Sequence, residues 1–153
     1  MEKTILKKTI IEKGIEKQAS IIEDFKTRIA EMKGSEELLG ESQYDAQQAS
    51  YNKETNERVD LLQEQLNFVE EEMNLLNRLN VDAPLHNSIH MGSIVVTDKR
   101  TFLISVSLEE FEANGEKIFG ISTKAPIYQF MTGKGIGDIF SFNGTSYKIL
   151  DIF

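Results

Sequence analysis

The first half of the chain carries apolar positions at a regular spacing between charged ones. Two stretches repeat apolar or uncharged residues at alternating spacings of four and three, which is a heptad pattern. In the first stretch these positions are Ile11, Ile15, Gln18, Ile22, Phe25, Ile29 and Met32. In the second stretch they are Thr55, Val59, Leu62, Leu66, Val69, Met73 and Leu76. The pattern predicts two helices, over about residues 4–33 and 44–79, each with one apolar seam.

A short acidic connector separates the two predicted helices. Its sequence is Gly34-Ser35-Glu36-Glu37-Leu38-Leu39-Gly40-Glu41-Ser42. Because so few residues join the two helices, the helices must run antiparallel. We therefore expect an antiparallel coiled coil over residues 1–80 that holds an acidic tip, near residues 34–43, away from the rest of the protein.

The pattern changes from a helical to a strand-like period after residue 91. A linker is expected at residues 81–91, where Pro84 and several Asn, Asp and Ser residues disfavour helix. Short β-branched or aromatic runs follow at residues 93–97, 102–107, 118–122, 139–142 and 147–153. Residues 125–131 read as a short helix that starts at Pro126, and Asn143-Gly144 is a type I′ turn pair. The predicted fold class is α+β, with an antiparallel helical hairpin before a small antiparallel sheet domain over residues 92–153.

Charge and composition narrow the classes of partner. The chain of 153 residues has a net charge of −8, and the first 82 residues carry most of it, with 18 acidic against 11 basic side chains. Such a chain lacks the basic patch that binding to duplex DNA requires, so a protein or a metal is the more natural partner of the acidic half. The absence of cysteine excludes disulfides and cysteine zinc sites. Without a long apolar run or a signal peptide, we expect a soluble cytoplasmic protein with no membrane partner.

The most specific stretch lies in the second half, at residues 121–138. It reads Ile-Ser-Thr-Lys-Ala-Pro-Ile-Tyr-Gln-Phe-Met-Thr-Gly-Lys-Gly-Ile-Gly-Asp. Physically this is a strand, a helix started by proline, and a glycine-rich exit in which Gly133 occupies the left-handed position after a helix. The stretch resembles the C-terminal domain of the bacterial GreA/GreB transcript-cleavage factors, which has an FKBP-like fold. The preceding coiled coil with its acidic tip matches that family in length, order and position.

The resemblance implies a function in transcription. Members of that family dock their C-terminal domain at the rim of the RNA polymerase secondary channel, and their coiled coil enters the channel. The corresponding docking residues here are Lys124, Ala125, Pro126 and Ile127. Lys33 and Lys53 lie along the tip half of the hairpin, where basic residues of that family contact nascent RNA or the channel wall. The other interpretation of these two lysines is ordinary i,i+4 pairing with the surrounding glutamates. The resemblance implies an accessory factor of core RNA polymerase that is not itself an enzyme. We expect a monomer, because the seam of the hairpin is satisfied within one chain.

The resemblance also assigns a catalytic role to the tip. Two tip carboxylates in the family help hold a catalytic Mg²⁺ and its attacking water beside aspartates of the polymerase. Glu37 and Glu41 are the corresponding candidates, as catalytic residues and as ligands of the shared Mg²⁺. Mg²⁺ takes hard oxygen ligands, so added carboxylates can complete a shared site.

Two positions depart from the family pattern. The family tip has Asp, two intervening residues and then Glu, closely followed by Tyr. An alignment on Tyr44 without gaps places Glu37 and Gly40 at these positions, and only a shift of one residue pairs Glu37 with Glu41. In addition, Lys124 stands where the family tends to carry Asp or Asn.

These departures leave three hypotheses open. The first is a channel-binding factor that promotes cleavage of backtracked RNA through Glu37 and Glu41. The second is a channel-binding regulator of the same architecture that does not cleave. The third is a coiled-coil or FKBP-like binding module unrelated to transcription. His86 and His90 have a spacing of four, but they follow Pro84 in the linker without a third ligand, so we expect no metal there.

Overall fold

The computed structural model describes residues 2–39, 46–80 and 83–153, with the backbone alone for residues 35–39 and 46–52. Its helices and strands are α1 (Lys3–Leu39), α2 (Ala46–Asn80), β1 (Ile94–Thr97), β2 (Thr101–Ser105), β3 (Leu108–Ala113), β4 (Glu116–Ser122), α3 (Pro126–Met131), β5 (Ile139–Phe142) and β6 (Thr145–Ile152). They form two compact units. The hairpin unit is Gln18–Glu72, and the sheet unit combines Met1–Lys17 with Met73–Phe153.

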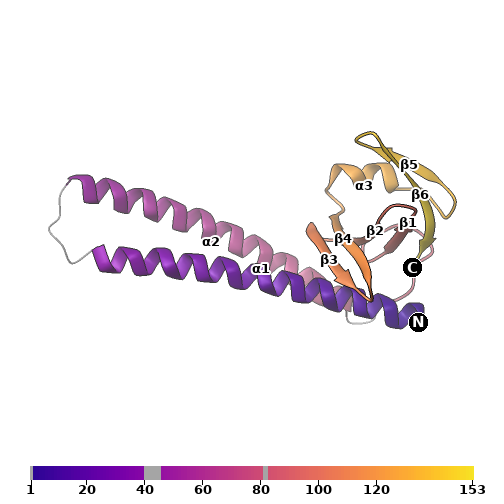
Figure 1. Cartoon of the computed structure of the whole chain (residues 1–153), viewed down its shortest axis with the longest axis horizontal. Coiled ribbons are helices and arrows are strands. Elements are labelled where there is room, and N and C mark those ends of the chain that lie inside the picture. The colour runs from indigo at the N-terminus through magenta and orange to yellow at the C-terminus, as the bar shows by residue number, and fades with distance from the viewer. Residues whose placement is uncertain (1, 40–45, 81–82) are drawn as a thin grey trace. The chain divides into compact units, whose positions relative to one another are not determined.

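The hairpin unit confirms the two helices that the heptad pattern predicts. Within it, α1 and α2 run side by side and antiparallel (Figure 1). Its buried centre consists of Ile29, Val59 and Leu66. Half-buried seam residues flank this centre, namely Ile22, Phe25, Met32, Leu62 and Val69. The expected end of the first helix near residue 33 was too early, because α1 continues to Leu39 and includes residues placed in the connector.

The sheet unit contains the strands that sequence reasoning predicted and one that it missed. The strand order is β3-β4-β2-β1-β6-β5. The pairs β1–β2 and β5–β6 are antiparallel, as the predicted antiparallel sheet domain requires. The missed strand is β3, which pairs with β4 and carries three glutamates among its six residues. The expected α+β class is therefore confirmed, with one parallel pair, β2–β4, in a sheet that is otherwise antiparallel.

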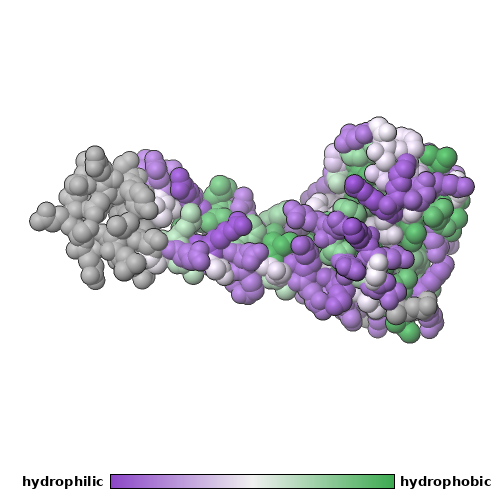
Figure 2. Space-filling model, in the orientation of Figure 1, coloured by the Kyte–Doolittle hydropathy of each residue, from purple (hydrophilic) through white to green (hydrophobic). Residues whose placement is uncertain are grey.

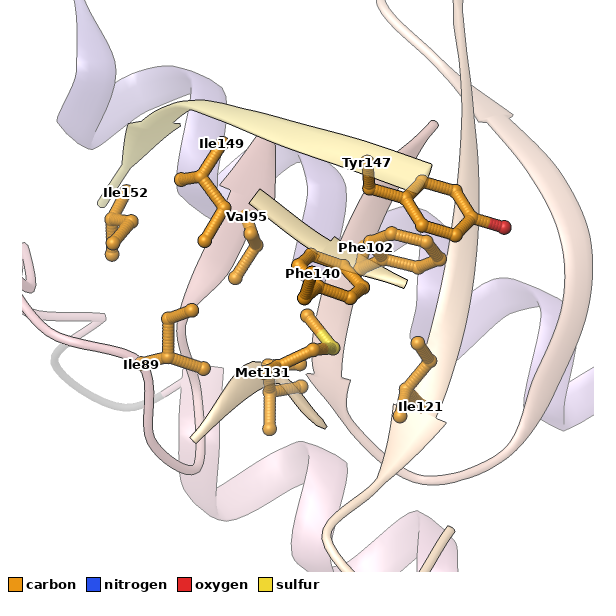
Figure 3. Close-up of a cluster of buried hydrophobic side chains, with 10 residues drawn as sticks. Ile89, Val95, Phe102, Ile121, Met131, Phe140, Tyr147, Ile149 and Ile152 are labelled. Carbon is orange, nitrogen blue, oxygen red and sulfur yellow. The ribbon is translucent and has the colours of Figure 1, made fainter. Parts of the chain in front are cut away.

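The sheet is buried on both faces where β2 crosses its middle, since all five residues of β2 are buried. On one face, Phe102 and Ile104 join an apolar cluster with Met131 of α3 (Figure 3). The cluster is completed by Ile89, Val95, Ile121, Phe140, Tyr147, Ile149 and Ile152. On the other face, Leu103 lies close to Gly14 of α1. The start of α1 and α3 thus cover opposite faces of one sheet.

Two Asn-Gly pairs in the sheet unit have left-handed backbone, and the sequence predicted the turn at Asn143-Gly144. Asn143 and Gly144 between β5 and β6 have φ values of 50° and 78°, as a type I′ turn requires. Asn114 and Gly115 between β3 and β4 have φ values of 52° and 79°. Asparagine and glycine tolerate this left-handed region better than other residues, so both hairpins are specified locally.

Candidate functional site

The two predicted tip carboxylates fall at the limit of what the structure describes. Glu37 lies in α1, whose backbone extends to Leu39, but its side chain lies outside the described part. Glu41 lies among residues 40–45, outside the described residues. Their assignment as catalytic residues and Mg²⁺ ligands therefore stays a prediction. No group of three or more acidic or histidine side chains that could hold a metal occurs among the described residues.

The two predicted RNA- or channel-contacting lysines lie near the ends of the helices that flank the tip. Lys33 in α1 and Lys53 in α2 are both exposed. Within the part of the chain whose side chains are described, neither makes an ion pair, whereas Lys26 lies 3.9 Å from Glu23. The exposure of both lysines is compatible with a contact with nucleic acid.

The four predicted docking residues form the corner between β4 and α3. The hydroxyl oxygen of Ser122 accepts a hydrogen bond of 3.1 Å from the backbone N–H of Lys124, and its carbonyl oxygen accepts one of 2.9 Å from Ala125. Pro126 then occupies the first turn of α3, as predicted. Lys124 and Pro126 are exposed, while Ala125 and Ile127 pack against the core cluster. The corner is therefore held rigidly, and only half of the predicted set is free to meet a partner.

Exposed apolar side chains lie on α3, on the segment after it and at the start of β5. Phe130 is 50% exposed, and its ring centroid lies 5.8 Å from that of Phe142. Ile136 and Ile139 are 62% and 60% exposed. Hydrophobic areas of this kind interrupt the hydrophilic surface of the sheet unit (Figure 2). We call Lys124, Pro126, Phe130, Ile136 and Ile139 the α3 surface.

A pocket that sequence reasoning missed lies within the sheet unit, between the start of α1, the end of α2 and the segment that leads to β1. It has a volume of about 320 Å³, and its polar lining includes Lys7, Arg78 and His86. Lys7 is 1% exposed and donates a hydrogen bond of 2.5 Å to the carbonyl oxygen of Pro84. Burial lowers the pKa of Lys7 to about 8. One signal was available, because Lys7 lies three and four residues before Ile10 and Ile11 and so shares their helix face. We call this cavity the base pocket.

Hydrogen bonds beside the base pocket indicate which ring nitrogen of His86 carries a proton. The hydroxyl of Ser93 donates to the carbonyl oxygen of Ser88 at 3.0 Å and accepts from the backbone N–H of His90 at 3.0 Å. Its single proton is thereby used, so the Nδ1 atom of His86, 2.7 Å away, is assigned as the donor. The Nε2 atom of a neutral His86 then carries the free lone pair.

Electrostatics agree with a neutral His86. The pKa of His86 is lowered to about 4, mainly by burial and to a smaller extent by the positive charges of Lys7 and His90. The rings of His86 and His90 stack with their centroids 3.8 Å apart. The two histidines therefore contact each other face to face beside a buried cation.

Comparison with known proteins gives one informative similarity. The chain is 34% identical over 99 residues to transcription elongation factor GreA of Chlamydia trachomatis. The aligned part covers 63% of this chain, but the chain spans only 14% of the length of that protein. No protein-family model matches the sequence. None of the described helices combines the length and the apolar character that a membrane span needs.

Proposed function

We propose that this chain is a GreA-like transcription factor that binds core RNA polymerase and acts on elongation. The observation that carries the proposal is the identity of 34% over 99 residues to a transcription elongation factor. The order of elements adds support, since an antiparallel helical hairpin precedes an α+β sheet unit, as the resemblance to the GreA/GreB factors implies. In this role the chain is an accessory factor, and the polymerase performs the chemistry.

The tip residues would determine the effect on the polymerase. Glu37 and Glu41 would share a Mg²⁺ ion with carboxylates of the polymerase, because Mg²⁺ prefers hard oxygen ligands and keeps several waters. The ion, when bound, activates water for cleavage of backtracked RNA. The exposed Lys33 and Lys53 would contact nascent RNA or the channel wall by charge attraction.

The α3 surface would contact the polymerase at the rim of the secondary channel. It presents exposed apolar side chains, which favour binding to a protein. Lys124 adds one positive charge at its edge. Because the β4–α3 corner is held by backbone hydrogen bonds, docking there needs little reordering of the chain.

The test measures cleavage and binding in the same reconstituted system. Stalled, backtracked complexes of the cognate core polymerase are incubated with the wild type or with the double variant Glu37→Ala/Glu41→Ala. The matched control is Glu12→Ala/Glu16→Ala, which removes the same charge at the same spacing from an exposed part of α1. We expect cleavage by the wild type and the control, and its loss in the tip variant with polymerase binding retained. Absence of binding by the wild type would contradict the proposal.

A second function is favoured by the tip sequence itself. Without a gap in the alignment, Gly40 rather than a carboxylate occupies the second acidic position of the GreA/GreB pattern. A tip with one carboxylate fewer holds Mg²⁺ less well. The alternative is therefore a channel-binding regulator that does not cleave. Binding to core polymerase in competition with a known channel-binding factor, without cleavage by the wild type, would select this alternative.

A further inference from the structure

Basic side chains gather in the described lining of the base pocket. Lys7, Arg78 and His86 supply its ionisable side chains, and no carboxylate belongs to its described lining. The Lys7 ammonium has three N–H donors, and its hydrogen bond to Pro84 uses one of them. Burial of a charged group costs free energy when some of its N–H donors have no acceptor, so a further acceptor stabilises it. The pocket therefore favours an anion on electrostatic grounds.

Arg78 supplies a second cation to the same pocket. It lies in the last turn of α2, is exposed, and makes no ion pair among the described residues. Its planar guanidinium can bind a carboxylate or phosphate with two hydrogen bonds. After burial, the positive charge of Lys7 is the next contribution that lowers the pKa of His86. Two cations from different helices thus converge on one cavity.

The rest of the lining is apolar. Leu79, Ala83 and Met91 form part of the wall. A volume of about 320 Å³ stands at the lower end of the range for small-molecule sites, roughly 300–1,000 Å³. Apolar walls with a few convergent polar groups are typical of such sites. This combination suits an anion that carries a small apolar body better than a bare inorganic ion.

We propose that the base pocket binds a small organic anion, with a carboxylate or phosphate group on Lys7 and Arg78 and an apolar body against Leu79, Ala83 and Met91. The site lies wholly within the sheet unit. It is independent of the proposed role in transcription. A purely structural role for Lys7, as a link between α1 and Pro84, makes the opposite prediction, namely that anions leave the pocket unaffected.

The test uses the full chain labelled with ¹⁵N and follows backbone amides by NMR. Benzoate and phenyl phosphate are the probes, titrated at constant ionic strength, and benzamide is the neutral control of the same size. We expect saturable shifts at Leu79, His86 and Gly92 with at least one of the two anions. Benzamide should bind at least about tenfold more weakly, because it lacks the charge that Lys7 and Arg78 attract. Binding of benzoate alone or of phenyl phosphate alone would identify the preferred head group.

Variants then assign the binding to the pocket. Lys7→Met keeps a long apolar side chain and removes the charge, and Lys8→Met removes the same charge from the exposed neighbouring position. We expect anion affinity to fall at least about tenfold in Lys7→Met and to change less than about twofold in Lys8→Met. If Lys7→Met does not fold, Arg78→Gln is compared with Arg58→Gln, an exposed arginine elsewhere on α2. Absence of saturable shifts with both anions, or equal affinity in each variant and its control, would overturn the proposal.

Discussion

The side-chain amide of Gln18 in α1 donates a hydrogen bond of 2.9 Å to the backbone carbonyl oxygen of Val69 in α2. Gln18 is 1% exposed although it occupies a position of the apolar seam. Its amide also lies 3.3 Å from the Oε1 atom of Glu72. A buried polar residue with its partners on the facing helix can fix the register of a coiled coil at some expense of stability. Gln18 thus links α1 to α2 at one level of the seam, and we expect this link to favour the observed alignment of the two helices.

Two substitutions of Gln18 test how much its side-chain amide contributes to stability. Gln18→Ala leaves a cavity and removes the hydrogen bonds, so we expect the free energy of unfolding to fall by about 1–3 kcal/mol. Gln18→Leu fills the space with an apolar side chain, and the free energy of unfolding should stay within about 1 kcal/mol of the wild type. Urea unfolding followed by circular dichroism measures both. A loss in Gln18→Leu as large as in Gln18→Ala would show that the amide contributes mainly to stability.

Gly120 in β4 is required by the close approach of the segment that leads into β3. A Cβ atom at this position would lie 2.6 Å from the Cβ atom of Leu108 and from the carbonyl oxygen of Val106. We expect Gly120→Ala to lower the free energy of unfolding by about 2–4 kcal/mol, because two strands must move apart. Thermal unfolding of the purified variant measures the loss.

Gly34 provides the matched glycine substitution. It lies within α1, and an added Cβ would meet no atom within 4 Å. Gly34→Ala should raise stability by about 0.5–1 kcal/mol, because alanine favours helix over the unfolded chain. If Gly34→Ala and Gly120→Ala shift the unfolding midpoint alike, the steric reason given for Gly120 is wrong.

The buried Lys7 should make stability depend on alkaline pH. Burial lowers its pKa from the usual 10.5 to about 8 in the folded protein. Between these values the unfolded chain binds the proton more readily, so the contribution of Lys7 to the free energy of unfolding rises as pH increases from about 8 to about 10.5. Urea unfolding across this window should show a rising difference between the wild type and Lys7→Met. Lys8→Met is the control, and its free energy of unfolding should follow the same pH dependence as that of the wild type. If Lys7→Met also follows the wild type, the lowered pKa of Lys7 is contradicted.

The proposed role of the α3 surface can be tested through its aromatic side chain, Phe130. If the proposed docking holds, Phe130→Ser should weaken binding to core polymerase at least about tenfold, because exposed aromatic residues often dominate protein interfaces. Leu150→Ser is the control, since Leu150 in β6 is exposed to the same fraction, 50%. Binding is measured by fluorescence anisotropy with the labelled chain. If both variants lose the same binding affinity, the loss reflects general damage to the sheet unit, and the docking role of the α3 surface is not supported.

Several features of the fold follow from short segments of sequence and could be predicted from them. The seam of Ile22, Ile29 and Leu66 follows from heptad spacing, because a helix brings residues three and four apart onto one face. The β5–β6 turn follows from Asn143-Gly144, whose residues tolerate positive φ. The acidic tip and its possible pairs of carboxylates are also readable from sequence, although the described residues do not extend to Glu41.

Only the tertiary structure decided the features that depend on residues far apart in the sequence. The charged pattern of β3 gave no strand signal, and this segment becomes a strand because β4 offers it an edge with which to pair. The parallel pairing of β2 with β4 likewise depends on the whole sheet rather than on any turn. Lys7 shares a helix face with Ile10 and Ile11 in the sequence, but its partner, the carbonyl oxygen of Pro84, is distant in sequence and reaches it only in the folded chain. Local sequence thus determined helices and turns, since their hydrogen bonds close over a few residues, whereas burial and the base pocket required the folded chain.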